Sequence, residues 1–287
     1  MKKILVCFGS MLAIQASAQT KHGDSATYVL HKFAQAIGKE VSYRKDSANS
    51  IWYDIQFHFN DRGMPVDLHA EERLDKKINP QHLFIKGGTS RFSVLNDSVW
   101  IDGKTVRFKI DDSLTQYKKM ADMFPVAGYS PGTVQMSLLQ YWLSHNQPKN
   151  IKLLPVGDAE IKKAGTDTFQ VNGKPLLLDR YVIKGIVWGN EMLWLKKNQQ
   201  LAALITNDAE GDKLELVEAS IESILPDLLE KGAVYGMQLF RESLPATKES
   251  KAASWLQHVN VVDVESGSVK TDQDLIVHNG IIQAMGA

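Results

Sequence analysis

Hydrophobic and polar residues alternate with a period of two along much of the chain between residues 50 and 220. The clearest case is 51–60, where every second residue from Ile51 to Phe59 is apolar or aromatic and the others, apart from Trp52, are polar. This period places successive side chains on opposite faces of a strand. Turn dipeptides such as Asp102-Gly103 and Asn172-Gly173 separate the runs. The pattern predicts roughly ten antiparallel strands, over 51–60, 65–74, 82–86, 91–95, 98–101, 104–110, 178–187, 191–196, 201–207 and 213–220, with a further strand from 151.

Three segments show helical spacing instead. In 24–38 the apolar residues recur at helical intervals, Asp24 or Ser25 is a capping residue, and Gly38 is an end signal. A second helical segment is expected over 114–145. Pro125 interrupts it, and the helical spacing of apolar residues is clearest over 133–145. The third helix is expected over 222–242. The sequence therefore predicts an α+β fold for 24–220, with helices packed on a large curved antiparallel sheet, followed by a helix and linker over 221–254.

The first residues have the features of a secretory signal peptide. Lys2 and Lys3 precede a short apolar run over 4–14, and Ala16-Ser17-Ala18 is a small-x-small cleavage site. The run is shorter than the roughly 20 residues that a membrane-spanning helix needs. We therefore expect cleavage after Ala18 and a soluble mature protein in the periplasm or outside the cell.

Composition and charge exclude several classes of protein. The chain has 33 basic and 33 acidic residues, and removal of Lys2 and Lys3 leaves a formal charge of −2, which gives no attraction to nucleic acid. Cys7 is the only cysteine and lies in the expected signal peptide, so the mature chain has no disulfide, thiolate zinc site or cysteine nucleophile. No other apolar stretch is long enough to cross a membrane.

Residues with functional chemistry form no recognisable motif. His58, His69 and His82 are close in sequence, but no two histidines have the i,i+2 or i,i+4 spacing that zinc ligands often show. Solvated strand histidines are the favoured interpretation. The aromatic residues Tyr141, Trp142, Trp188 and Trp194 are candidates to line a pocket, although core positions use the same side chains. The sequence therefore predicts no catalytic, cofactor-binding or metal-binding residue in this chain.

The order of the elements over 26–220 resembles that of LolA-like exported domains. In that class a curved antiparallel sheet wraps around helices. The resemblance implies an apolar concave face for a lipophilic ligand or a partner protein.

The last segment has a different pattern, that of three short strands. Residues 256–264 and 275–278 are apolar-rich, a Ser266-Gly267 turn follows the first run, and Asn279-Gly280 connects the second run to 281–285. The spacing of the apolar residues, the aspartate and the Asn-Gly turn in this segment resembles that in the opening strands of the amidohydrolase superfamily. The matching residues are Val259, Asn260, Val261, Val262 and Asp263, then Leu275, Ile276, Val277, Gly280, Ile282, Met285 and Gly286.

This resemblance implies that 255–287 begins a composite β-sandwich. In the family, the sandwich is completed by strands from the far C-terminus, and a metal-dependent (β/α)₈ barrel is inserted between the two parts. The His-x-His of the family's metal centre lies beyond the first hairpin, and no His-x-His occurs here. A barrel also needs about 250 residues. We therefore expect a non-catalytic N-terminal portion of an exported hydrolase acting on C–N bonds, with a divalent metal such as zinc in the missing barrel. The alternative is a stand-alone exported binding module.

Overall fold

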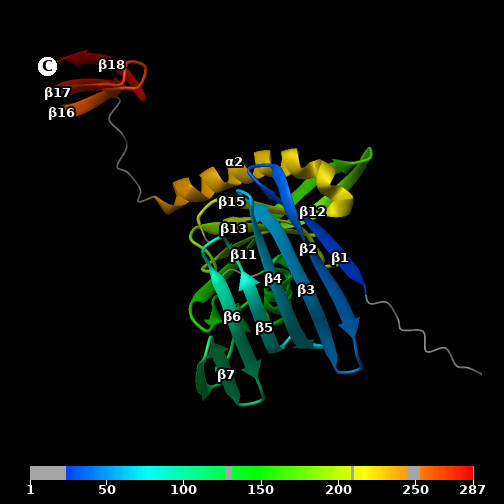
Figure 1. Ribbon diagram of the computed structural model, residues 1–287. Helices are drawn as coiled ribbons and strands as arrows, with labels where there is room; N and C mark the ends of the chain where they lie inside the picture. The colour runs from blue at the N-terminus through cyan, green and yellow to red at the C-terminus, as the bar shows by residue number, and fades with distance from the viewer. Residues whose placement is uncertain (1–23, 127–130, 208–209, 245–252, 287) are drawn as a thin grey trace, which may run out of the picture. The chain divides into compact units, whose positions relative to one another are not determined.

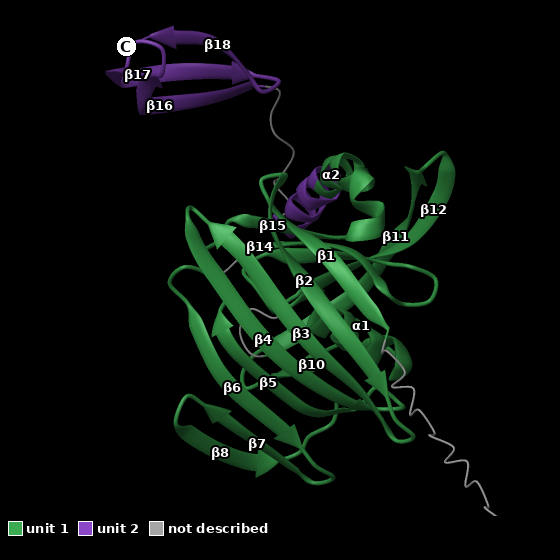
Figure 2. Ribbon diagram, turned by 45° about the vertical axis from the view of Figure 1, so that its right-hand side comes forward, with its two compact units in different colours: residues 1–232 green, residues 233–287 purple. Residues whose placement is uncertain are grey.

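A computed structural model describes residues 24–126, 131–207, 210–244 and 253–286 (Figure 1). The expected signal peptide, 1–18, lies outside the described residues. The chain divides into two compact units, Met1–Gly232 and Ala233–Ala287 (Figure 2), and each is described by itself. No helix among the described residues combines the length and the apolar character that a membrane span requires.

The first unit contains a 15-stranded sheet that is antiparallel at all but one pairing. Its order is β8-β7-β6-β5-β4-β3-β2-β1-β15-β14-β13-β12-β11-β10-β9, so β1 joins two meanders by pairing with both β2 and β15. The strands are β1 (Ser25–Lys32), β2 (Gln35–Asp46), β3 (Ser50–Asp61), β4 (Met64–Asp75), β5 (Pro80–Gly88), β6 (Val94–Ile101), β7 (Thr105–Ile110), β8 (Ser113–Lys118), β9 (Met123–Pro125), β10 (Ile151–Leu154), β11 (Asp158–Val171), β12 (Lys174–Lys184), β13 (Asn190–Leu195), β14 (Leu201–Asn207) and β15 (Lys213–Glu218).

Helix α1 (Gly132–Ser144) lies inside the curve of this sheet. Every residue from Gly132 to Trp142 is buried, so the helix is covered on all sides rather than along one stripe. Its side chains contact strands from both meanders. Ser137 bonds to Glu72 on β4, and Gln140 bonds to the backbone of Gln199 between β13 and β14. The inner faces of the strands and α1 therefore form one hydrophobic core.

The predicted α+β fold class is wrong, because the first unit is built mostly from strands. The segment 24–38, predicted as a helix, forms β1, a tight turn and the start of β2. The helix predicted over 114–145 exists only as α1, and the residues before it form β8 and β9. Hydrogen bonding to β15 and β2 on its two sides outweighs the helical spacing of β1, since strand preference depends on tertiary pairing.

Two helical segments follow β15. The 3₁₀ helix η1 (Ala219–Ile224) leads into α2 (Leu225–Ser243), which confirms the helix predicted over 222–242. Leu228 and Gly232 are buried, and a side chain at position 232 would meet Ile205 of β14. The first half of α2 therefore covers the outer face of the sheet.

The second unit contains a three-stranded antiparallel sheet in the order β16-β17-β18. The strands are β16 (Ala253–Asp263), β17 (Ser268–His278) and β18 (Ile281–Gly286), where the sequence predicts three strands. Leu275 is the only buried residue among these strands. Their other apolar residues are partly or fully exposed, so this sheet has no core of its own.

Candidate functional site

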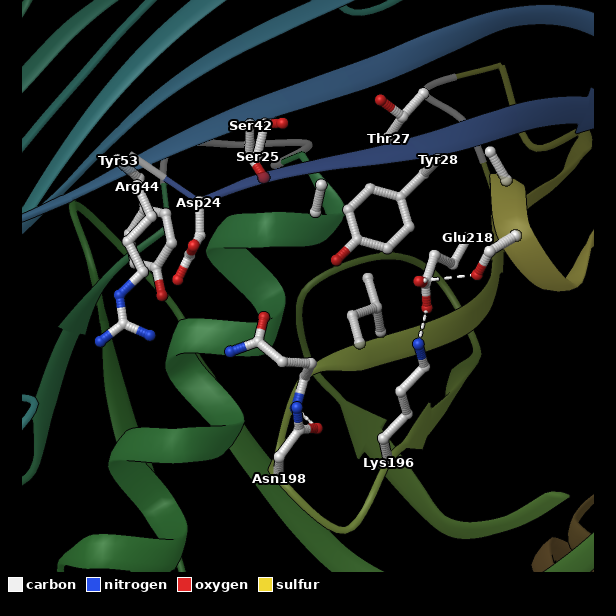
Figure 3. Close-up of a pocket in the computed structure, with 15 residues that line it drawn as sticks. Asp24, Ser25, Thr27, Tyr28, Ser42, Arg44, Tyr53, Lys196, Asn198 and Glu218 are labelled. Carbon is white, nitrogen blue, oxygen red and sulfur yellow. Dashed lines mark hydrogen bonds and ion pairs between the residues drawn. The ribbon is translucent and has the colours of Figure 1, made fainter. Parts of the chain in front are cut away.

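A groove of about 610 Å³ opens at one end of the large sheet. Its lining comes from the beginning of β1, the end of β2, the start of β3, the turn between β13 and β14, and the end of β15 (Figure 3). These segments meet because neighbouring strands are antiparallel, so a strand start lies beside the end of its neighbour. The groove thus lies where the two meanders join.

One wall carries the hydroxyl groups of three nearly buried residues on adjacent strands. Tyr28, Ser42 and Tyr53 are 1%, 4% and 4% exposed and lie on β1, β2 and β3. None of these hydroxyls bonds to another described residue, and the Tyr28 hydroxyl points into the groove in Figure 3. Arg44 lies directly opposite Tyr53 in the β2–β3 register. Because these hydroxyls line the groove and bond to no described residue, this wall offers hydrogen bonds that the protein itself leaves unused.

Both phenols are held in their neutral form. Burial raises the pKa of Tyr53 to about 12, and the nearby Glu72 and Asp46 add to this while Arg44 opposes it. Burial also raises the pKa of Tyr28 well above its ordinary value, with Glu40, Glu218 and Tyr53 contributing. The charged phenolate is disfavoured because it would lose its hydration among acidic neighbours. At neutral pH both groups therefore donate and accept hydrogen bonds.

The opposite wall is the β13–β14 turn and the end of β15. Lys196 forms an ion pair with Glu218 across the groove wall, as Figure 3 shows. Asn198 accepts a hydrogen bond from the backbone nitrogen of Gln200 at 3.2 Å. The Gln140 amide of α1 donates to the Gln199 carbonyl at 2.8 Å and fixes the turn against the buried helix. This wall is therefore held in place from the protein interior.

Three buried carboxyl groups surround α1, and each bonds to the helix rather than to the groove. Glu40 accepts from the backbone nitrogens of Gly132 and Thr133 at 2.7 and 2.9 Å and so satisfies two free donors at the helix start. Glu72 accepts from Ser137 Oγ at 2.6 Å, and Glu191 accepts from the Gln135 side chain of α1 as well as from Thr206 Oγ1 of β14 at 2.6 Å.

Burial raises the pKa of all three carboxyl groups, to about 8 for Glu72 and about 7 for Glu191. Their hydrogen bonds to neighbouring residues partly oppose the effect of burial. Glu72 therefore carries its proton at neutral pH. We interpret the three groups as positioning α1, because each is fully enclosed.

The residues that the sequence singled out lie apart from the groove. His58 bonds to Asp67, His69 bonds to Asp54 at 3.2 Å, and the ring of His82 stacks on Trp100. In the described part of the chain, no three His, Cys, Asp or Glu side chains form a group able to hold a metal ion.

The aromatic candidates occupy different environments. Trp142 is buried in the core beside Tyr141, whereas Trp194 is buried under α2, where its ring nitrogen donates to Asp167 at 2.8 Å. Trp188 is 91% exposed. These residues therefore do not line a common pocket. The groove residues had no signal in the sequence, because β1 was predicted as a helix and its inner face could not be aligned with Ser42 and Tyr53.

Comparisons with known proteins give no functional assignment. No family model and no curated protein matches the chain. One similar solved structure is described as a beta-barrel-like protein of the domain of unknown function DUF1849 from Brucella abortus. It is 10% identical, the match covers 68% of this chain and 94% of that one, and the TM-score is 0.47.

Proposed function

We propose that this chain is the non-catalytic N-terminal portion of an exported, metal-dependent amidohydrolase-like hydrolase that acts on C–N bonds. The observation that carries the proposal is the apolar surface of the β16–β18 sheet. Ile281 and Ile282 are consecutive strand residues and so lie on opposite faces, yet they are 64% and 58% exposed. Trp255 and Val262 are also more than 60% exposed. A small sheet that is apolar on both faces requires further strands to cover it, and a composite sandwich supplies them.

The residues shared with the amidohydrolase opening shape the turns of this sheet. Asp263 Oδ1 accepts from the backbone nitrogens of Glu265 and Ser266 at 3.0 and 3.2 Å. Asn279 and Gly280 have φ values of 48° and 75°, which suit the tight turn between β17 and β18. Asp263 and Gly280, two of the matching residues, thus have structural roles in the turns of this sheet, and these roles support the resemblance.

In this proposal the catalytic machinery belongs to a barrel outside these residues. The barrel would be the partner of the small sheet within the same polypeptide and would hold the divalent metal, which activates water for attack on the scissile bond. Residues 1–18 would direct the whole protein to the periplasm or the exterior. The large sheet would then be an accessory region in front of the enzyme.

Sequencing the gene downstream of the Ala287 codon tests the proposal. We expect an open reading frame that encodes a His-x-His motif soon after Gly286 and continues for at least the length of a barrel. The longer polypeptide, purified from the exported fraction, should contain stoichiometric divalent metal by elemental mass spectrometry. A stop codon directly after Ala287, or a longer frame without metal-ligating motifs, would contradict the proposal.

The second candidate is a stand-alone exported binding module for a lipophilic ligand or a protein partner. The groove at the junction of the two meanders favours a binding role. Helix α1 packs against the apolar inner face of the large sheet and fills the space there. A lipophilic ligand would therefore have to lie in the groove or displace the helix. Native mass spectrometry of the exported protein should show co-purified lipid if this candidate holds, and a ligand-free mass would count against it.

A further inference from the structure

We propose that the groove beside Tyr28, Ser42 and Tyr53 is a binding site for a neutral oligosaccharide. The site lies entirely within the first unit, so it is independent of the proposal that the second unit belongs to a hydrolase. The inference rests on which polar groups of the lining are already paired and which are not.

The buried and half-buried charges of the groove lie in ion pairs, although Arg44 Nε and Glu218 Oε2 are buried without a well-formed hydrogen bond. Arg44 Nε lies 2.9 Å from Asp46 Oδ2, and Asp46 also binds Lys76 at 2.6 Å. Lys196 pairs with Glu218, which also accepts from Ser220 at 2.9 Å. Asp24 is exposed at the margin of the groove, where water hydrates it. An ionic ligand would therefore find few charges that its own charge could compensate, and it would lose hydration on entering.

The neutral polar groups of the lining are hydroxyls and side-chain amides, of which Asn198 Oδ1 already accepts from the Gln200 backbone. The hydroxyls of Tyr28, Ser42 and Tyr53 belong to nearly buried residues that line the groove, and none of them bonds to another described residue. Each hydroxyl is both a donor and an acceptor, as are the side-chain amides of Asn198 and Gln200 on the opposite wall. Sugar hydroxyls have the same dual character, so one sugar ring can satisfy several of these groups at once. A ligand with a single polar end would leave most of them unpaired.

The shape of the groove suits more than one sugar ring. Ligand sites in proteins usually enclose about 300–1,000 Å³, and the groove measures about 610 Å³. The apolar side chains of Ala26 and Leu201 and the ring of Tyr28 line it beside the polar groups. Such surfaces can pack against the C–H face of a sugar ring while its hydroxyls reach the polar groups. We therefore expect a ligand of two or three rings.

Saturation-transfer NMR and calorimetry on the whole chain test the proposal. The neutral probes are maltotriose, cellotriose, xylotriose and triacetylchitotriose, and the charged probes are trigalacturonate and deacetylated chitotriose. At least one neutral trisaccharide should bind with a Kd below about 1 mM. Neither charged probe should bind as tightly, because the charges of the groove are already paired.

Phenylalanine variants locate the site. Tyr53→Phe and Tyr28→Phe each remove one hydroxyl that bonds to no described residue, so both should fold normally and weaken binding about tenfold, roughly the value of one hydrogen bond. Tyr43→Phe is the matched control, because Tyr43 is 42% exposed and lies on β2 between the inward-facing Ser42 and Arg44.

Three results would overturn the proposal. The first is a folded chain that binds none of the neutral trisaccharides. The second is neutral-sugar binding that survives unchanged in both groove variants, which would place the sugar elsewhere. The third is tighter binding of a charged trimer, which would assign the groove to an ionic ligand.

Discussion

Glu72 links the protonation of one buried side chain to the stability of the first unit. Burial raises its pKa to about 8, and its Oε1 atom has no hydrogen-bond partner. In the unfolded chain a glutamate titrates near 4.3. The folded state therefore binds the proton more tightly, and this stabilisation is present below about pH 4 and is lost as the pH rises through 8.

We therefore expect Glu72→Gln to reduce the loss of stability at alkaline pH. At about pH 4 the variant should nearly match the parent protein, because the acid that the amide replaces is then uncharged in the folded chain and largely uncharged in the unfolded chain. At about pH 9 it should be more stable by at least 1.4 kcal/mol, the equivalent of one unit of pKa difference. Urea unfolding at both pH values measures this. Glu71→Gln is the control, since Glu71 is the next residue on β4 and faces the other side. Equal pH profiles for Glu72→Gln and the parent would refute the linkage.

A cluster of charged residues closes the end of the large sheet opposite the groove. Asp61 is 3% exposed and lies 3.0 Å from Lys32 Nζ and 3.3 Å from Arg91 Nε. Asp61→Asn should cost about 3 kcal/mol, the low end for breaking a buried ion pair, because Lys32 keeps its second contact with Asp212. Asp112→Asn, at a fully exposed position, should change stability by less than about 0.5 kcal/mol. Similar unfolding midpoints for the two variants would contradict a stabilising role for Asp61.

At the scale of elements, the sequence predicted strands that show strict alternation or are joined by Asn-Gly turns. It missed the β1–β2 hairpin, whose turn lacks such residues. Strand β3 shows strict alternation, and Asn172-Gly173 and Asn279-Gly280 adopt the positive φ values that such turns need. The β1–β2 turn is Phe33-Ala34, and both residues have positive φ. Neither residue favours that conformation, so the hairpin had no turn signal. The groove was missed for the same reason.

Gly38 provides a test of this corrected assignment. The helix prediction makes it an end signal, whereas the structure places it in β2, where a Cβ atom would collide with the backbone of His58 and Phe59 on β3. Gly38→Ala should therefore destabilise the chain by about 1–3 kcal/mol, as overpacking does. Gly103→Ala should be nearly neutral, since nothing lies within 4 Å of an added Cβ there. Thermal unfolding compares the two, and a harmless Gly38→Ala would argue against the β2–β3 register.

At the scale of the whole molecule, the two units differ in how much of their backbone a core protects. Strands β13 and β14 are buried from Glu191 to Thr206 at almost every strand position, between α1 on one face and α2 on the other. The β16–β18 sheet buries only Leu275 among its described residues. Opening of a local region becomes less costly as the buried apolar area decreases.

Hydrogen exchange measured by mass spectrometry should therefore separate the units. Peptides from β16, β17 and β18 should exchange at least tenfold faster than peptides from β13 and β14, which corresponds to an opening free energy lower by at least about 1.4 kcal/mol. Slow exchange in the small sheet would mean that it is stable without covering strands, and the composite-sandwich proposal would lose its main support. If the gene extends past Ala287, the same peptides in the longer polypeptide should become protected, because the added strands would bury the exposed faces of Ile281 and Ile282. Protection that appears only in the longer polypeptide would show directly that the small sheet is completed by the rest of its own chain.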